Sequence, residues 1–228
     1  MIPSARIAAN LESVRNRIAA ACQRASRDIS EVRLVAVTKT VGVDEIRALH
    51  GLGVKDIGEN RVAEGLAKHE ALGDLACCWH FIGHLQRNKA RKAVRVFRFL
   101  HSLDSLELAK ILQVEAEKGG FAMDVLLEIN IAGEESKYGL RPEEVLPTAR
   151  AIQRLSRLRL QGLMTMAPQV DDPEKTRPVF RILRQMRDRV SAEIGMTLPH
   201  LSMGMSNDFE VAIEEGATMV RIGTSLFR

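Results

Sequence analysis

The stretch Arg33-Leu-Val-Ala-Val-Thr-Lys39 is a short apolar run that ends in a lysine, and seven runs of similar character follow it. Together they cover residues 33–37, 56–58, 79–82, 98–102, 125–130, 160–163, 200–202 and 219–222. Short runs that are almost continuously hydrophobic are typical of parallel strands buried on both faces. The sequence therefore predicts eight parallel strands, the first of which carries Lys39 at its carboxyl end.

Longer stretches between these runs have apolar residues at helical spacing. They cover residues 44–52, 61–72, 87–96, 105–118, 142–155, 173–194 and 208–216, and an additional helix over residues 7–26 precedes the first strand. Strands that alternate with helices indicate a parallel sheet, and eight strand–helix units are the number that closes a barrel. We predict an α/β fold, a single (β/α)8 TIM-type barrel with an extra N-terminal helix. A doubly wound open sheet is the alternative.

Composition indicates one ordinary globular domain. Of the 228 residues, 46% are hydrophobic and 27% are charged, which excludes a disordered chain. Barrels of this length are commonly single domains, and no stretch rich in proline, glycine and serine suggests a linker. We therefore expect one domain over residues 1–228. The net charge of +4 tolerates an anionic ligand without demonstrating one.

Cysteine usage and the amino terminus predict the compartment. Cys22, Cys77 and Cys78 are an odd number of cysteines without the spacing of a disulfide framework. Residues 1–10 contain no apolar run of signal-peptide length, and no stretch approaches the ~20 apolar residues of a membrane span. We expect a cytoplasmic protein that does not enter the membrane. No role is predicted for Cys77 and Cys78.

The densest basic stretch, residues 87–98, favours a solvated helix face over a nucleic-acid surface, because its lysines and arginines alternate with apolar residues at helical spacing. His80 and His84 are four residues apart, as helical metal ligands would be. However, Gly83 and the apolar run before it predict a strand here. We expect neither a nucleic-acid partner nor a metal.

Lys39 is the most informative polar residue at the carboxyl ends of the strands, where active sites of such barrels form. By strand alternation it shares a face with Val35 and Val37, which in a barrel is the interior. We expect a partly desolvated lysine, and the neutral amine is the form that Schiff-base formation requires. The alternative is a strand-end lysine whose head extends into solvent.

Two turns rich in small residues follow the seventh and eighth strands, at residues 202–207 and 223–225. Gly204 and the hydroxyl side chains would let backbone N–H groups face an anion at the start of a helix. Loops after strands seven and eight are a frequent phosphate site in this fold. An ordinary capped turn would have the same composition, so both interpretations stay open.

Six motifs are similar to those of a known family: Val35-Ala-Val-Thr-Lys39, Ile57-Gly-Glu-Asn60, Trp79-His-Phe-Ile-Gly-His84-Leu-Gln-Arg-Asn-Lys89, Gly162-Leu-Met-Thr-Met166, Leu201-Ser-Met-Gly-Met-Ser-Asn-Asp208 and Val220-Arg-Ile-Gly-Thr224. In order and spacing, the chain resembles the pyridoxal phosphate homeostasis protein family from residue 35 to its carboxyl terminus. The resemblance implies a fold like the barrel domain of alanine racemase. It also implies one cofactor, pyridoxal 5'-phosphate (PLP).

The resemblance assigns roles to single residues. Lys39 would hold PLP as a Schiff base. Arg221 would approach the pyridine nitrogen and keep it unprotonated, because a guanidinium cannot accept a hydrogen bond. The phosphate would be held by Ser202, Ser206, Gly223 and Thr224. The remaining pocket residues would be Asn60, His84 and Met164.

Three functions remain open from the sequence. A carrier would store PLP and deliver it to apo-enzymes without established catalysis, as the resemblance implies. An amino-acid racemase would need a second base opposite Lys39, for which Tyr138 is the one tyrosine in the chain. A barrel enzyme acting on a sugar phosphate would use Lys39 on its substrate, with Glu128 or Asp104 as base. Because alanine racemases pair through a second domain that is absent from this chain, we expect a monomer.

Overall fold

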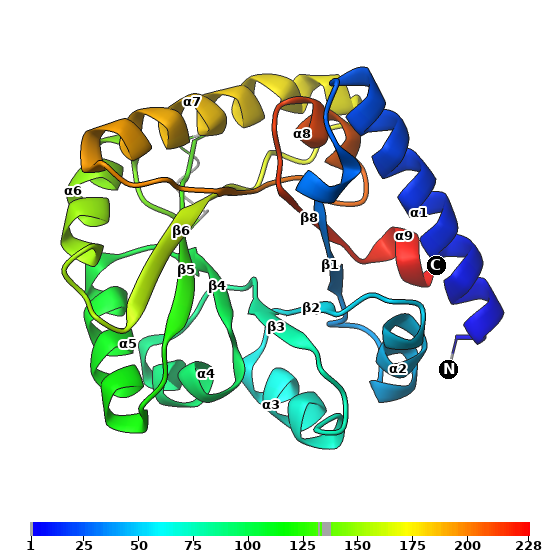
Figure 1. Ribbon diagram of the computed structural model, residues 1–228, viewed down its shortest axis with the longest axis horizontal. Helices are drawn as coiled ribbons and strands as arrows, with labels where there is room; N and C mark the ends of the chain where they lie inside the picture. The colour runs from blue at the N-terminus through cyan, green and yellow to red at the C-terminus, as the bar shows by residue number, and fades with distance from the viewer. Residues whose placement is uncertain (1, 132, 134–137) are drawn as a thin grey trace.

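Eight parallel strands close into a barrel in sequence order, with β8 pairing back to β1 (Figure 1). This computed structural model describes residues 2–131, 133 and 138–228. The strands are β1 Arg33–Val37, β2 Asp56–Glu59, β3 Cys78–Phe81, β4 Phe99–Leu103, β5 Met123–Glu128, β6 Leu158–Met164, β7 His200–Ser202 and β8 Met219–Ile222. The predicted barrel is confirmed, and the open sheet is wrong because β1 and β8 are hydrogen-bonded neighbours.

Helices surround the barrel on its outer face (Figure 1). They are α1 Ser4–Arg24, α2 Val43–Gly51, α3 Val62–Ala71, α4 Ala90–Val96, α5 Leu106–Gly119, α6 Pro142–Ile152, α7 Arg177–Ile194, α8 Phe209–Glu214 and α9 Thr224–Phe227. Short 3-10 turns lie at Ile29–Glu31, Arg87–Lys89 and Pro173–Thr176. Every predicted strand and helix appears, and strand ends differ from the prediction by at most two residues.

Two predicted helices begin later than expected, and one helix was not predicted. The stretch 173–194 starts as a 3-10 turn, and α7 begins only at Arg177. Pro178 lies in the first turn of α7, where its missing N–H is tolerated. Its ring disfavours helical backbone in the residues before it, so the helix starts late. Likewise, residues 87–89 form a 3-10 turn before α4. Helix α9 has four residues, too few to show a helical period.

The extra N-terminal helix α1 covers the barrel where the helix after β8 is too short to do so. Its buried residues recur every three to four positions and face the barrel: Ile7, Leu11, Val14, Ile18, Ala21 and Cys22. It packs against α8, α9 and α2, and Figure 1 shows it running along this side of the molecule. The side-chain amide of Asn10 donates hydrogen bonds to the carbonyls of Leu226 and Arg228, which attaches α1 to the chain end.

The interior of the barrel contains far less apolar surface than the layer between strands and helices. Its apolar cluster draws one residue from each of five strands: Val35, Phe99, Leu126, Met164 and Met219. Much of the remaining interior is polar and buried, including His80, His101, Ser202 and Arg221. Buried polar groups require partners, so these side chains carry specific structure or function.

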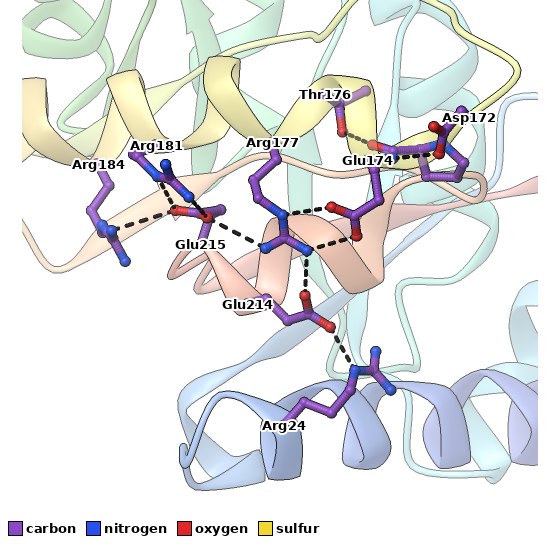
Figure 2. A network of polar contacts seen from close by, with 10 residues as sticks. Arg24, Asp172, Glu174, Thr176, Arg177, Arg181, Arg184, Glu214 and Glu215 are labelled. Atoms are coloured by element: carbon purple, nitrogen blue, oxygen red, sulfur yellow. Dashed lines mark hydrogen bonds and ion pairs between the residues drawn. The ribbon is translucent and has the colours of Figure 1, made fainter.

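Helix α8 follows the loop after β7, and a network of charged residues fixes it to its neighbours (Figure 2). Glu214 bonds Arg24 of α1 and Arg177 of α7, each at 2.6 Å. The adjacent Glu215 contacts Arg181 of α7 at 2.9 Å and is buried. Glu214 at the end of α8 and Glu215 directly after it therefore tie α1, α7 and α8 together.

Helix α4 is amphipathic, as the sequence predicted for the basic stretch. Ala90, Ala93 and Val94 are buried, whereas Arg91 and Lys92 are exposed. The alternation of charged and small apolar residues is therefore that of a helix with one solvated face.

The three cysteines are free thiols, with Cys22 buried and Cys77 and Cys78 half-buried. Within the part of the chain that the structure describes, every helix is too short or too polar to cross a membrane.

Candidate functional site

Lys39 lies in the turn that follows β1, at the carboxyl end of the barrel. Its side chain is exposed, and it forms no hydrogen bond or ion pair with the residues that the structure describes. The expectation of a partly desolvated lysine is therefore wrong for this structure. The strand ends at Val37, so the barrel wall no longer covers the side chain two residues later. The mouth nevertheless presents a primary amine that none of the described residues engages.

Glu59 fixes the backbone just before Lys39 and does not face the mouth. Its Oε1 accepts hydrogen bonds from the hydroxyl of Thr38 at 2.5 Å and from Lys68 Nζ at 2.7 Å. Lys68 Nζ also donates to the carbonyl of Thr38 at 2.7 Å. Glu59 is fully buried and Lys68 is 13% exposed, so this triad joins the residue after β1 to β2 and α3 with little access of solvent. It makes the position of the Lys39 turn depend on a buried ion pair.

Asn60 follows β2 and carries a polar atom with an unused hydrogen-bonding capacity. Its Oδ1 is buried and has no hydrogen-bond partner within the described residues. A Cβ added at Gly83 would lie 2.5 Å from the carbonyl oxygen of Asn60, so only glycine lets the loop after β3 pass this close. An unsatisfied buried acceptor is unfavourable unless a ligand or water completes it.

Arg221 of β8 is a buried cation near the mouth, with 4% of its surface exposed. Its Nη1 donates to the hydroxyl of Ser202 at 2.5 Å, and its Nη2 donates to the carbonyl of Thr165 at 3.0 Å. Burial lowers the pKa of Arg221 to about 10, although Glu128 and Asp208 act in the opposite direction. At neutral pH the guanidinium is therefore still charged, and two of its donors are fixed.

Ser202 is the last residue of β7, directly before the turn in which the sequence predicted a phosphate contact. The hydroxyl is fully buried in the barrel interior and contacts Arg221 and, at 2.8 Å, Nδ1 of His101. Strand alternation turns the side chain inward. The structure thus gives this hydroxyl two partners inside the barrel, and the predicted contact with a phosphate stays a prediction.

The two turns predicted as an anion site do meet in the structure. The backbone N–H of Ser225 donates to the hydroxyl of Ser206 at 3.3 Å, which joins the turn after β8 to the turn after β7. A Cβ added at Gly223 would lie 3.3 Å from Val37, so this turn also contacts the end of β1. Thr224 is exposed beside them. Ser206, Gly223 and Thr224 therefore lie next to the strand that leads to Lys39.

His84 borders a second part of the mouth. Its Nδ1 lies 2.9 Å from Asp104 Oδ2, and its ring stacks on the ring of Tyr138 with centroids 3.6 Å apart. These three residues line a cavity of about 440 Å³, together with residues of the α5 start. By contrast, Met164 is fully buried in the apolar cluster inside the barrel. His84 is therefore available to a ligand at the mouth, and Met164 forms the layer beneath.

Glu128 and His101 are the residues that sequence reasoning undervalued. Glu128 ends β5 and is 4% exposed, and the sequence predicts for it only the role of a base in a sugar-phosphate enzyme. Burial and the neighbouring Asp104 raise its pKa to about 7, with Arg221 acting in the opposite direction. His101 of β4 is fully buried and was not considered at all. Strand alternation with Phe99 was the available signal, because Phe99 also faces inward.

The floor of the barrel, formed by the amino ends of the strands, holds the one group of described side chains that could bind a metal. Asp56, Cys78 and His80 have ligand atoms within 4.8 Å of one another. However, Asp56 already bonds His80 at 2.9 Å and lies 3.6 Å from Arg33. Burial and the Asp56 charge raise the pKa of Cys78 to about 11, which opposes the thiolate that a metal requires. Asp56 is thus already occupied by a hydrogen bond from His80 and an ion pair with Arg33.

Residues 9–228 match the family model described as alanine racemase, N-terminal domain. The chain is 48% identical over 217 residues to the pyridoxal phosphate homeostasis protein of Aquifex aeolicus, with 95% of each chain covered. The chain belongs to the pyridoxal phosphate homeostasis protein family. The resemblance found in the sequence motifs is thereby confirmed.

Solved structures agree with this assignment. PipY from Synechococcus elongatus, solved with PLP bound, superposes with a TM-score of 0.87 at 34% identity, covering 97% of this chain and 100% of PipY. Alanine racemase from Clostridium difficile superposes with a TM-score of 0.77 at 18% identity, covering 99% of this chain and 57% of the racemase. The second likeness concerns the fold alone, and it confirms the predicted alanine racemase-type barrel.

Proposed function

We propose that this protein binds PLP covalently through Lys39 at the barrel mouth and holds it for storage or for delivery within the cell. The observation that carries the proposal is the amine of Lys39, which is exposed at the mouth and has no partner among the described residues. Strands β2 and β8 flank β1 and bring Asn60 and Arg221 to the same end of the barrel. The family relationship and the PLP-bound relative PipY support the same ligand.

The residues present fit this ligand. The buried Oδ1 of Asn60 offers an unused acceptor beside the ring. Arg221 has five N–H donors, of which Ser202 and Thr165 take two, so donors remain for the ring nitrogen. Backbone N–H groups and hydroxyls of Ser206, Gly223 and Thr224 suit a dianionic phosphate. His84 and Met164 would complete the pocket from the side and from below.

A holding role follows from the donor set. PLP supplies an aldehyde that bonds reversibly to an amine, so another amine can displace Lys39. Arg221 cannot accept a hydrogen bond and therefore does not favour a protonated ring nitrogen, which weakens the ring as an electron sink. Racemisation would additionally need a second base, and Tyr138 is 55% exposed and stacked on His84. We therefore propose a carrier without a catalytic role of its own, and not a racemase.

The proposal includes the protein's surroundings. We propose a single-domain monomer of the cytoplasm that delivers PLP to apo-enzymes, with no nucleic-acid or membrane partner. The amphipathic α4 and the free thiols support these points. Size-exclusion chromatography coupled to light scattering tests the monomer, and transfer of PLP to an apo-enzyme in a coupled activity assay tests delivery.

The test of the binding site compares Lys39→Ala with Lys92→Ala. Lys92 is also exposed but lies on α4, away from the mouth. We expect visible absorbance after PLP addition in the wild type and in Lys92→Ala, and none in Lys39→Ala. Borohydride reduction followed by peptide mass spectrometry should locate the label on Lys39. A label spread over several lysines, or absorbance retained by Lys39→Ala, would contradict the proposal.

Carrier and racemase are separated by turnover. Purified protein loaded with PLP is incubated with single L-amino acids, and the D-enantiomer is measured over hours. We expect less than one product molecule per protein. Sustained formation that disappears in both Lys39→Ala and Tyr138→Phe would instead establish the racemase and identify its two bases.

A further inference from the structure

A continuous chain of hydrogen bonds, buried except at its Asp56 end, runs through the barrel from the mouth to the floor. Arg221 Nη1 contacts Ser202 Oγ at 2.5 Å, and Ser202 Oγ contacts His101 Nδ1 at 2.8 Å. His101 Nε2 lies 2.9 Å from His80 Nδ1. His80 Nε2 lies 2.9 Å from Asp56 Oδ1. Five strands, β2, β3, β4, β7 and β8, each contribute one residue to this chain.

The chemistry of the two ends fixes the direction of every bond. Arg221 can only donate, so Ser202 Oγ accepts from it. The hydroxyl proton of Ser202 is given to Nδ1 of His101, because the bonds that start at the Asp56 end, described next, leave that nitrogen unprotonated. At the other end the carboxylate of Asp56 only accepts, so His80 donates from Nε2. Neutral His101 consequently donates from Nε2 to Nδ1 of His80, and all four bonds point from the cation to the anion.

Both histidines are neutral in this environment. Burial lowers the pKa of His80, although its hydrogen bond to Asp56 acts in the opposite direction. Burial also holds the pKa of His101 well below its usual value, and the nearby His80 and Arg221 add to this effect. Arg221 remains protonated, so it does not pass a proton along the chain. The chain is therefore a row of aligned dipoles between two fixed charges, which strengthen one another.

We infer that Ser202, His101, His80 and Asp56 are positioning residues for Arg221, and that the distant Asp56 carboxylate thereby influences how the mouth binds its ligand. This inference rests on the proposed function, because it assigns Arg221 to the ring nitrogen of PLP. Ser202 and the Thr165 carbonyl hold the two ends of the guanidinium fork. The orientation of the remaining donors is thus set by groups that never touch the ligand.

Packing alone does not explain the chain. The ring of His80 stacks on Phe99 with centroids 4.9 Å apart, and any planar side chain could make that contact. Packing has no need for the complementary donors and acceptors that run from Ser202 to Asp56. The matched test is therefore a change that keeps shape and removes only charge. Asp56→Asn does this at a half-buried carboxylate, and Asp124→Asn makes the same change at a buried carboxylate on the floor.

The first experiment uses the protein without PLP. Side-chain ¹⁵N spectra of the imidazole and guanidinium groups are recorded for the wild type, Asp56→Asn and Asp124→Asn at neutral pH. We expect the Nε2–H tautomer for both histidines in the wild type. We further expect Asp56→Asn to shift the resonances of His101 and Arg221 more than Asp124→Asn does. Equal shifts in the two variants, or the Nδ1–H tautomer at either histidine, would overturn the inference.

The second experiment measures PLP affinity by absorbance titration, with Ser202→Ala as an additional variant in which the chain is cut next to Arg221. We expect Kd to rise about fivefold in Asp56→Asn and in Ser202→Ala, the effect of losing roughly one hydrogen bond. Asp124→Asn should stay near the wild-type value. Thermal unfolding confirms that each variant is folded.

The two experiments keep this inference separate from the proposed function. The wild type could fail to bind PLP while Asp56→Asn still shifts the ¹⁵N resonances of Arg221 more than Asp124→Asn does. In that case the hydrogen-bond chain exists and the proposed function is wrong. If PLP labels Lys39 in every variant with unchanged Kd and the imidazole resonances stay in place, the proposed function stands and the chain has no positioning role.

Discussion

The two ends of the barrel interior treat their polar groups in opposite ways. At the floor, charges are paired: Arg33 lies 3.6 Å from Asp56, and Asp124 lies 3.2 Å from Arg98 and 2.7 Å from Arg159. At the mouth, Lys39 and the Oδ1 of Asn60 have no partner within the described residues. We therefore interpret the paired groups of the floor as structural and the groups without a described partner at the mouth as ligand-binding.

The largest expected effect follows from replacing Arg221, the charged group of the mouth. Arg221→Gln should weaken PLP binding by roughly 10- to 100-fold, because it removes a charge-assisted hydrogen bond. Stability without PLP should change little, since a buried cation is itself unfavourable and its loss offsets the lost bonds to Ser202 and Thr165. Absorbance titration and thermal unfolding measure the two quantities. A variant that loses stability and keeps its affinity would place Arg221 with the floor residues.

Glu128 should make the stability of the ligand-free protein depend on pH. Its pKa is raised to about 7 in the folded state by burial and by Asp104. Because the pKa of Glu128 is raised on folding, its contribution to the free energy of unfolding is fully present below its unfolded pKa. This contribution is lost as pH rises through about 7. Between pH 5 and pH 8 the loss should be about 2 kcal/mol. Urea unfolding at several pH values measures it.

Glu128→Gln provides the control for this pH dependence. The amide cannot ionise, so the variant should show a flatter stability profile and should exceed the wild type at the alkaline end. An unchanged profile in Glu128→Gln would assign the effect to another group of the mouth, such as Asp208, whose pKa burial also raises.

The sequence predicts the barrel but only part of the mouth, and the reason is the range of the interactions. Apolar runs and helical periods are local, so they locate all eight strands. Strand alternation also predicts that Val35 faces inward, which its place in the interior cluster confirms. It does not predict that the side chain of Lys39 extends into solvent, because that depends on where the strand ends.

Contacts across the barrel are beyond the reach of such patterns. Ser202 and His101 are 101 residues apart in the chain and meet only because β4 and β7 close around a common interior. The sequence shows that Ser202 follows an apolar run and precedes a glycine turn, which equally fits a phosphate loop. Its contact with His101 joins strands that are not neighbours in the barrel, so no local pattern predicts it.

At the floor, the paired charge of Asp124, which lies outside the hydrogen-bond chain to Arg221, should matter for stability and not for ligand binding. Asp124→Asn removes the partner of Arg98 and Arg159, whose side chains are 49% and 44% exposed and can turn to solvent. We therefore expect a loss of only about 1–2 kcal/mol in the free energy of unfolding. PLP affinity should be unchanged. A loss of affinity without a loss of stability would break the distinction between floor and mouth.

The smallest expected effect concerns charges outside the barrel, in the network around α8 (Figure 2). Burial raises the pKa of Glu214, but hydrogen bonds from Arg177 and Arg24 outweigh it and lower the pKa overall. Because the pKa of Glu214 is lowered on folding, its contribution to the free energy of unfolding is present above its unfolded pKa. This contribution is lost as pH falls through its folded pKa. Glu214→Gln should therefore cost about 0.5–1 kcal/mol at neutral pH and less in acid.

This last effect should be local, because α8 has six residues and follows the turn that contains Ser206. Hydrogen exchange should show faster exchange of the α8 amides in Glu214→Gln, with the strand amides unaffected. Asp188→Asn is the matched control, since Asp188 also pairs with an arginine on α7 but is 60% exposed. If both variants change the exchange of the α8 amides equally, the network acts through net charge alone. If only Glu214→Gln changes it, the ion pairs of Glu214 hold α8 and the turn with Ser206 that precedes it.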